Sequence, residues 1–419
     1  MRVFGFRIFA VGDYFPAFLY ACFVLFLGFS AAASALSFYY ADAAFYNGSE
    51  ADAAAAVSFQ PQNPDAHKTR GMVFLRHMDY EAAADAFEQA AALRQNDFLL
   101  WLRLGYCRLQ LKNFDAAQAA YEKALVLAPN YSQPNYYFGS MLLETARPEQ
   151  AFQFLSKAAE QDNDIYPEVL NLARTAFPGD PLAIERAVWP ASVDGRKTVA
   201  GYFIEHGLMT DTVRSFLTSD ELSEKEKNEL VRSLIYKQNF QFAREVWLSR
   251  SKTDNGSAQQ PIFDGGFENI TDSDESGLGW QIAQNVTAFS VARDNKVFHS
   301  GSKALEIKFA GNVDVNKPLI SQLAYLEPHR KYQLRFFYRS TELISAGLPL
   351  VVISDGVSGE VLGRSAALVA TDAKWLESRI DFTTGGAPVA LISFQRTDCP
   401  SPCPIFGEVF LDDFSVIEN

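Results

Sequence analysis

A pattern of glycine, alanine and aromatic residues returns every 34 residues in the first half of the chain, and it constrains the fold more than any other feature. Residues 78–97, 113–130 and 146–163 share it. The matching sets are Gly71, Gly105 and Gly139; Ala83, Ala117 and Ala151; Phe87, Tyr121 and Leu155; and Ala90, Ala124 and Ala158. Each unit indicates two antiparallel helices that touch at the small residues, with a large side chain filling the space beside them. One hairpin buries too little apolar surface alone, so the pattern predicts a stack of hairpins, an α-solenoid.

These positions resemble the tetratricopeptide repeat. The middle unit adds Trp101, Leu104 and Pro129 at the family's spacing, and it departs from the family in having Arg108 where Tyr is usual. We expect three such repeats over 66–164. The resemblance implies that the concave groove of the array binds a peptide or a partner protein. The alternative is a spacer or a dimer surface, and the sequence names no contact residue in the groove.

After Asp164 the pattern weakens but helical sequence continues. We expect degenerate hairpins of the same kind over 165–250, the last of them at 223–250. Ser223 with Glu226 has the spacing of a capping box, in which each side chain satisfies a free backbone N–H of the other residue.

The N-terminal region holds no charged residue from Tyr14 to Ala41. A helix of about 20 apolar residues can cross a bilayer, so we expect residues 14–41 to be a transmembrane anchor, followed by a linker at 42–65. Arg2 and Arg7 precede the anchor, which leaves residues 1–13 in the cytoplasm and exports the rest. For a bacterial chain this predicts the inner (cytoplasmic) membrane, a single pass and a periplasmic bulk. The alternative is a signal peptide cleaved at the "ASA" of 33–35 and a secreted protein.

The period of the sequence changes from helical to alternating beyond a polar linker at 251–261. In residues 331–340, Tyr332, Leu334, Phe336 and Tyr338 fall on one face of a strand, and Gln333, Arg335, Phe337 and Arg339 fall on the other. Further short strands bounded by Gly, Pro and Asp predict a β-sandwich or jelly roll over 262–419. The expected fold class is therefore multidomain α plus β: a transmembrane helix, a helical solenoid and a sandwich.

The motifs of this last region resemble the jelly-roll carbohydrate-binding modules of the galactose-binding-like group. They are "FDGGFENI" at the start, "HSGSKALEI" at 299–307 and "LDD" at 411–413. Sugar sites of such modules combine an aromatic platform with planar polar groups. The candidates here are Arg335, Phe337, Arg339, Trp375, Gln395 and Arg396. The alternative for Phe337 and Trp375 is an ordinary place in the core.

The same resemblance implies a structural calcium ion, because relatives often hold one between the first strand, the Ser-Gly turn and the last strand. A calcium ion takes several oxygen ligands. Glu268 and Asp413 are the matching carboxylates, with Asp412 as a second choice. The alternative is that these acids cap turns or pair with Lys303 or Lys308.

Cysteine usage agrees with export. Cys399 and Cys403 stand close together in the short "CPSPC" stretch, so a local disulfide is expected in an oxidising compartment. The alternative is two reduced thiols.

The charge and the motifs exclude several classes of function. A formal net charge of −13 does not suit a nucleic-acid-binding protein. No Gly-rich phosphate loop, His-Glu-x-x-His or Gly-x-Ser-x-Gly motif occurs, so we do not expect an enzyme. The sequence favours a membrane-anchored, exported adaptor that binds a protein through the solenoid and a glycan through the sandwich, in envelope polysaccharide assembly by resemblance. The alternatives are a glycan hydrolase with its site in the sandwich and a purely protein-binding scaffold.

Overall fold

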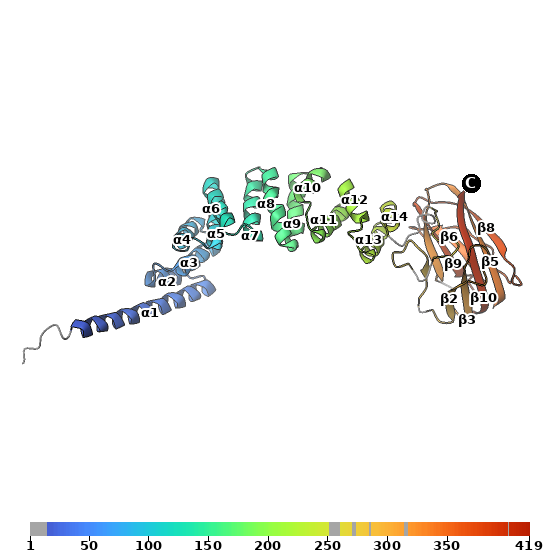
Figure 1. Cartoon of the computed structure of the whole chain (residues 1–419), viewed down its shortest axis with the longest axis horizontal. Helices are drawn as coiled ribbons and strands as arrows, with labels where there is room; N and C mark the ends of the chain where they lie inside the picture. Colours follow the sequence, from blue (N-terminus) through green and yellow to red (C-terminus); the bar gives the residue numbers. More distant parts are fainter. Residues whose placement is uncertain (1–14, 251–259, 270–273, 285, 314–316, 401) are drawn as a thin grey trace, which may run out of the picture. The chain divides into compact units, whose positions relative to one another are not determined.

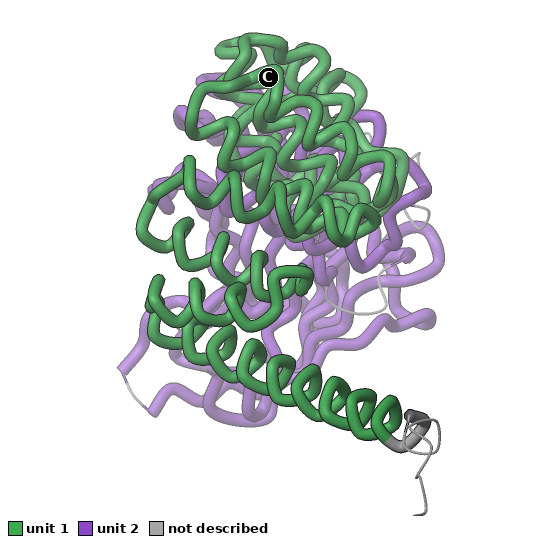
Figure 2. Tube along the Cα trace, turned by 90° about the vertical axis from the view of Figure 1, so that its left-hand side faces the viewer, with its two compact units in different colours: residues 1–213 green, residues 214–419 purple. Residues whose placement is uncertain are grey.

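The computed structural model describes all residues except 1–14, 251–259, 270–273, 285, 314–316 and 401. Helices form the first part of the chain and strands the last part (Figure 1), which confirms the predicted fold class. The chain divides into two compact units, residues 1–213 and 214–419 (Figure 2). The boundary falls within α12, so the last helical hairpin belongs to the same unit as the strands.

The helices follow one another with short connections. They are α1 (Phe15–Asn47), α2 (Glu50–Phe59), α3 (Pro64–Arg76), α4 (Tyr80–Leu93), α5 (Phe98–Gln110), α6 (Phe114–Leu127), α7 (Ser132–Glu144), α8 (Pro148–Gln161), α9 (Tyr166–Ala176), α10 (Pro181–Val188), α11 (Val193–His206), α12 (Asp211–Thr218), α13 (Glu224–Tyr236) and α14 (Phe240–Leu248), with a 3₁₀ turn, η2 (Asn163–Ile165), before α9. The capping box of Ser223 and Glu226 is formed at the start of α13.

The three glycines of the repeat occupy equivalent places in successive hairpins. A Cβ added to Gly71 would lie 2.8 Å from the ring of Phe87, and one on Gly105 would lie 2.7 Å from the ring of Tyr121. In the third hairpin a Cβ on Gly139 would lie 2.7 Å from Cγ of Leu155. The helices pair at this distance because the glycine has no side chain, and the large residue, which is fully buried, fills the gap.

The turns within these hairpins also repeat. Met78, Lys112 and Ala146 have φ near +58°, a left-handed conformation that reverses the chain between paired helices, and Gln238 does the same between α13 and α14. The first two turns continue into a capping residue: the side chain of Asp79 accepts from Ala82 N, and that of Asn113 from Ala116 N. The α13–α14 hairpin thus keeps the turn of the early repeats after the sequence pattern has weakened.

Helical structure replaces the linker expected at 42–65. The C-terminal part of α1 packs against α2 and α3, and Ala44, Ala53 and Val73 form a small buried cluster there. Ser37 Oγ donates to the carbonyl oxygen of Ala56 at 2.8 Å. Small side chains let the helices approach closely, so an alanine-rich stretch that carries no glycine or aromatic signal still forms a hairpin.

The strands form two five-stranded antiparallel sheets. The strands are β1 (Gln281–Ile282), β2 (Phe289–Asp294), β3 (Ala304–Asn312), β4 (Ile320–Tyr325), β5 (Lys331–Ser345), β6 (Pro349–Asp355), β7 (Val361–Arg364), β8 (Leu376–Thr383), β9 (Val389–Arg396) and β10 (Pro404–Glu418). One sheet has the order β1-β4-β9-β6-β7 and the other the order β2-β3-β10-β5-β8.

An aromatic cluster forms much of the core between the sheets. Phe336 stacks on Phe414 with ring centroids 4.8 Å apart, and Trp280 and Phe267 pack on Phe414 from other sides. The predicted alternation of β5 is confirmed, with Phe336 and its alternate neighbours buried. Strand β10 is bulged between Asp412 and Ser415, which places Asp412 and Phe414 in buried positions on either side of Asp413.

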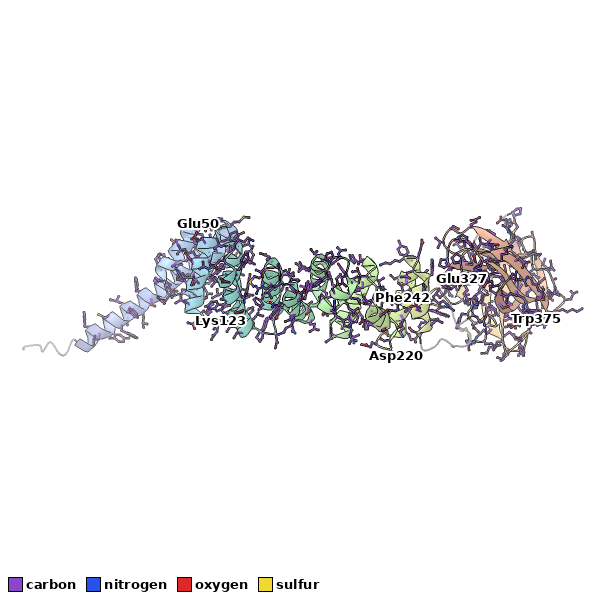
Figure 3. The ribbon with its side chains drawn as sticks, turned by 90° about the horizontal axis from the view of Figure 1, so that it is seen from above. Glu50, Lys123, Asp220, Phe242, Glu327 and Trp375 are labelled. Atoms are coloured by element: carbon purple, nitrogen blue, oxygen red, sulfur yellow. A yellow bond between two sulfur atoms is a disulfide. The ribbon has the colours of Figure 1, made fainter. Side chains whose placement is uncertain are left out.

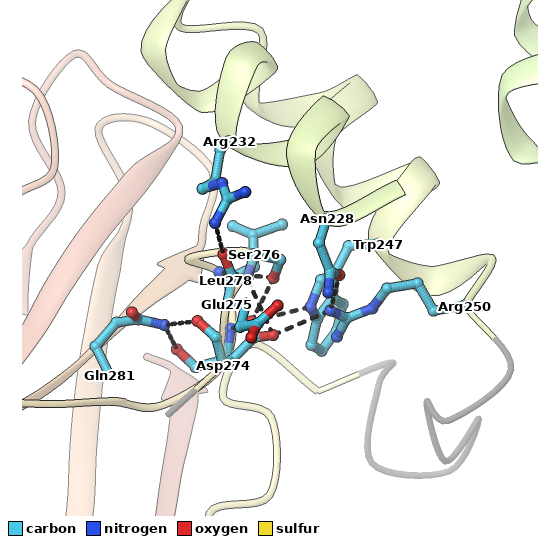
Figure 4. Close-up of polar contacts among 10 residues, drawn as sticks. Asn228, Arg232, Trp247, Arg250, Asp274, Glu275, Ser276, Leu278 and Gln281 are labelled. Atoms are coloured by element: carbon cyan, nitrogen blue, oxygen red, sulfur yellow. Dashed lines mark hydrogen bonds and ion pairs between the residues drawn. The ribbon is translucent and has the colours of Figure 1, made fainter. Parts of the chain in front are cut away.

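The helices α13 and α14 contact the strand region of their unit through a partly buried ion pair (Figure 4). Arg250 Nη1 lies 3.0 Å from Oδ1 of Asp274, and the guanidinium stacks 4.9 Å above the ring of Trp247. Trp247 Nε1 donates to the other oxygen of Asp274 at 3.3 Å. Burial alone would raise the pKa of Asp274, but the charge of Arg250 and the hydrogen bonds from Ser276 and Gly279 lower it overall. Of the linker predicted at 251–261, residues 251–259 lie outside the described residues.

Candidate functional site

The first helices of three successive hairpins line a half-open pocket on the solenoid. Its volume is about 410 Å³, and its lining residues are Leu75 from α3; Leu99, Leu102, Arg103 and Tyr106 from α5; and Gln133 and Tyr137 from α7. Leu99 and Tyr137 are about 40% exposed although they are large and apolar. Such side chains offer a binding surface for an apolar group.

The polar groups of this pocket are few. Arg103 is half-buried, and no acidic ion-pair partner for it lies among the described residues. Tyr137 stacks on the buried ring of Tyr121 at 6.4 Å, which holds its orientation. Burial raises the pKa of Tyr106, which keeps its phenol protonated and able to donate. The pocket therefore combines an apolar surface with one cation and a few hydrogen-bonding groups.

No residue of this groove was predicted from the sequence, although the sequence contains a signal for it. Leu99 and Gln133 occupy equivalent repeat positions, as do Arg103 and Tyr137. These positions vary between units, whereas the packing positions keep small or large apolar residues. The variable positions of the first helix are the ones that line the pocket.

A second pocket, of about 450 Å³, lies at one end of the β2-β3-β10-β5-β8 sheet. Its lining includes Asp264, His299, Arg335, Phe337 and Asp413. The ring of His299 stacks on Phe337 with centroids 3.7 Å apart, and it meets Trp375 edge-on at 5.7 Å. Three of the predicted sugar-binding candidates, Arg335, Phe337 and Trp375, thus lie around His299, which was not among the residues predicted from the sequence.

Acidic side chains of β10 hold the turn that carries His299. Asp413 Oδ2 lies 2.6 Å from Nδ1 of His299, and Asp413 Oδ1 accepts from Ser300 Oγ at 2.7 Å. Asp412 accepts from the backbone N–H groups of His299 and Ser300. Burial raises the pKa of Asp412 to about 6, and the charge of Asp413 adds to the effect, although the backbone donors oppose it.

Arg335 and Arg339 lie on the outer face of β5, as predicted. Arg335 is 3.7 Å from a carboxylate oxygen of Glu377, which also pairs with Arg379 at 2.8 Å. Arg339 lies further along β5, where its guanidinium stacks over Phe410 at 5.9 Å. Arg339 therefore stabilises the sheet surface and is not in the lining of the His299 pocket.

Gln395 and Arg396 lie elsewhere, because β9 belongs to the other sheet. Gln395 lines a separate pocket beside Leu350 and Val361. Arg396 is only 3% exposed and donates to the carbonyl oxygens of Val313, Gly347 and Cys403. The grouping of these two residues with Arg335 was wrong: strands that follow the same alternation need not share a sheet. Cys399 and Cys403 form a disulfide beside Arg396.

The acids assigned to calcium accept hydrogen bonds in the structure. Glu268 accepts from the backbone N–H and hydroxyl of Ser302 at 2.7 and 2.6 Å. Burial alone would raise the pKa of Glu268, but these hydrogen bonds lower it overall. Asp412 and Asp413 bind the adjacent turn, and among the described residues no group of three His, Cys, Asp or Glu side chains is arranged to hold a metal. The residues therefore match the turn-capping alternative, and calcium stays a prediction of the resemblance.

Comparison with known proteins supports the repeat. The tetratricopeptide repeat family matches residues 98–131, which are α5, α6, the turn between them and the turn after α6. Over 74 residues the chain is 31% identical to the peroxisomal targeting signal receptor of Saccharomyces cerevisiae, covering 18% of this chain and 12% of the receptor. The match thus spans about an eighth of that relative.

Two kinds of solved structure are similar to parts of the chain. MamA is 21% identical over 32% of this chain and 79% of its own, with a TM-score of 0.29. The CBM22-1 xylan-binding domain of Xyn10C from Paenibacillus barcinonensis is 15% identical over 37% of this chain and 91% of its own, with a TM-score of 0.27. Neither likeness carries an inference about function.

Proposed function

We propose that the protein is a membrane-anchored, exported adaptor whose solenoid binds an extended segment of a partner protein. The pocket across α3, α5 and α7 carries this proposal. An apolar side chain of the partner would cover Leu99, Leu102 and Tyr137, and a carboxylate, from an acidic residue or a chain end, would face Arg103. Charge-assisted hydrogen bonds of this kind fix orientation as well as adding affinity.

Peptide selection from a displayed library on the full-length protein tests this groove. Selected peptides should combine an apolar residue with an acidic group, and Arg103→Glu should lower their affinity at least tenfold. The matched control is Lys123→Glu, a charge reversal at an exposed position of α6 (Figure 3). Equal binding to both variants would place the interaction outside the groove.

The second candidate function is glycan binding by the sandwich, favoured by the aromatic surface of His299, Phe337 and Trp375 beside Arg335. Sugar rings pack on such surfaces while planar polar groups bind their hydroxyls. On a glycan array, Phe337→Ala should abolish retention by the full-length protein. Arg364→Ala, at an exposed position of the other sheet, should leave retention unchanged.

Binding is favoured over the hydrolase alternative because the pocket acids are already engaged. Asp264 accepts from the backbone N–H groups of Glu268 and Asn269, and Asp413 is bound to His299 and Ser300. Incubation with labelled polysaccharide distinguishes the two, because a hydrolase releases product and a binding module retains the polymer. A place in bacterial envelope polysaccharide assembly is proposed from the resemblance alone, and the purely protein-binding scaffold is the outcome if no glycan is retained.

A further inference from the structure

The helix α1 changes character along its length. Its first part exposes large apolar side chains in every direction: the consecutive residues from Phe23 to Leu27 are each about half to three-quarters exposed. A helix that is apolar all round lies inside a protein core or a membrane. Further along, Ser37 and Ala44 are fully buried against α2 and α3. One unbroken helix therefore has a bare apolar part and a part that belongs to the solenoid.

The change occurs about 20 residues into the helix. Gln60, at the end of α2, donates to Ser34 Oγ, and the loop from Phe59 to Pro64 borders a hollow whose other wall is formed by Phe26, Phe29 and Ala33. At 1.5 Å per residue, the stretch from Phe15 to Ser34 spans about 30 Å, the thickness of a bilayer's hydrocarbon core. The α2–α3 loop is therefore level with one edge of the apolar stretch.

The two ends of the α2–α3 hairpin differ in their charged residues. No charged residue occurs between Asp52 and Asp65, so the loop itself is uncharged, and Asp65, the first charged residue after it, is ion-paired with Arg94. Charged side chains lie at the opposite end, where Glu50 and Asp52 begin α2 and Arg76 ends α3, and Oε1 of Glu50 lies 2.7 Å from Nδ1 of His77. The exposed aromatic residues Phe38 and Tyr39 lie about one helical turn beyond Ser34, near the end of the uncharged segment, where a membrane interface favours aromatic side chains.

We propose that α1 is an uncleaved helix shared by the bilayer and the solenoid, and that the α2–α3 loop, Phe59 to Pro64, rests in the membrane interface. This rests on the anchoring part of the proposed function. A cut after Ala35 would separate Ser34 from Gln60 and remove the whole bare apolar part. With the helix intact, the first hairpin stands on the membrane without a flexible linker.

The test uses the full-length protein in phospholipid nanodiscs. With Cys22 replaced by Ser, a fluorescent probe is attached at Gln62→Cys in the loop or at Tyr131→Cys, an exposed position between α6 and α7. Lipids carrying a nitroxide near the headgroup should quench the probe at position 62 several-fold more strongly than the probe at position 131. A Gly-Ser-Gly-Ser insertion between Ala33 and Ser34 should abolish the difference while leaving the protein in the membrane.

The outcomes separate the two proposals. Equal quenching at both positions, in protein that stays in the membrane, would overturn the loop contact and leave the anchor standing. A mature protein isolated from cells with its N-terminus at Leu36 would overturn the uncleaved helix and the anchor together. Full-length mass with strong quenching at position 62 alone supports the inference.

Discussion

The solenoid and the sandwich bury their large side chains by different means. In the solenoid, the partner of each large residue lies one helix earlier in the chain, as Gly105 does for Tyr121, and the arrangement repeats. In the sandwich, Phe336 packs on Phe414, which comes from the far end of the domain. The solenoid is thus held together by contacts between residues close in sequence, and each hairpin packs only against its neighbours. The sandwich has one core, to which every strand contributes at once.

A core truncation in the sandwich should have the largest effect. Phe336 is fully buried, so Phe336→Ala leaves a cavity and should cost about 3–5 kcal/mol of unfolding free energy. The whole strand region should then unfold at a lower denaturant concentration. The fluorescence of Trp280 and Trp375 monitors this unfolding. Gln333→Ala, on the outer face of the same strand, is the control. If only one of the two sheets lost stability, the sandwich would not have the single shared core that distinguishes it from the solenoid.

The ion pair of Arg250 and Asp274 should come next. Asp274→Asn leaves a partly buried guanidinium without its carboxylate and should cost about 3 kcal/mol. The pKa of Asp274 is lowered from 3.8 in the folded state. The contribution of the pair is therefore complete above pH 3.8 and is lost as the pH falls below it. The difference between variant and wild type, measured by urea unfolding at several pH values, should shrink in acid. If the difference in unfolding free energy were the same at every pH, the charge of Asp274 would not be the source of the stabilisation.

A glycine substitution in the solenoid should have a smaller and more local effect. Gly105→Ala drives a methyl group into the ring of Tyr121 and should cost about 1–3 kcal/mol. Native-state hydrogen exchange should show faster opening in α5 and α6, with α9 to α11 nearly unchanged.

The matched control for that change is Gly201→Ala in α11, where a Cβ meets nothing within 4 Å. It should stabilise the helix by about 0.5–1 kcal/mol, because alanine loses less backbone entropy than glycine. If both changes have the same sign, close packing of glycine against the ring is not what governs the hairpin.

The surface ion pair of Asp65 and Arg94 should matter least. It joins the start of α3 to the end of α4, with a nitrogen of Arg94 2.7 Å from an oxygen of Asp65, but both side chains are about half exposed. Arg94→Ala should therefore cost about 0.2–1 kcal/mol and less in high salt. A larger loss in thermal unfolding would mean that polar surface contacts also define the local character of the solenoid.

Periodicity was enough to predict the solenoid because its contacts are close in sequence. The sandwich was predicted at the level of alternating strands, but strand order was not, which is why Gln395 and Arg396 were placed beside Arg335. The hairpin of α1 and α2 was missed because alanines such as Ala53 and Ala56 pack without the glycine and aromatic signal. His299 was missed because a turn residue has no period, and only its contacts with Phe337 and Asp413 reveal it.

The Trp247, Arg250 and Asp274 contact has a practical consequence for anyone dividing the gene. An expression boundary at residue 262 would strip Phe263 and Asp274 of the helical side chains that cover them, and the shortened product should be prone to aggregate. A boundary ahead of α13 keeps the covering hairpin, so the smallest well-behaved piece for crystallisation or glycan screening should carry two helices along with its strands.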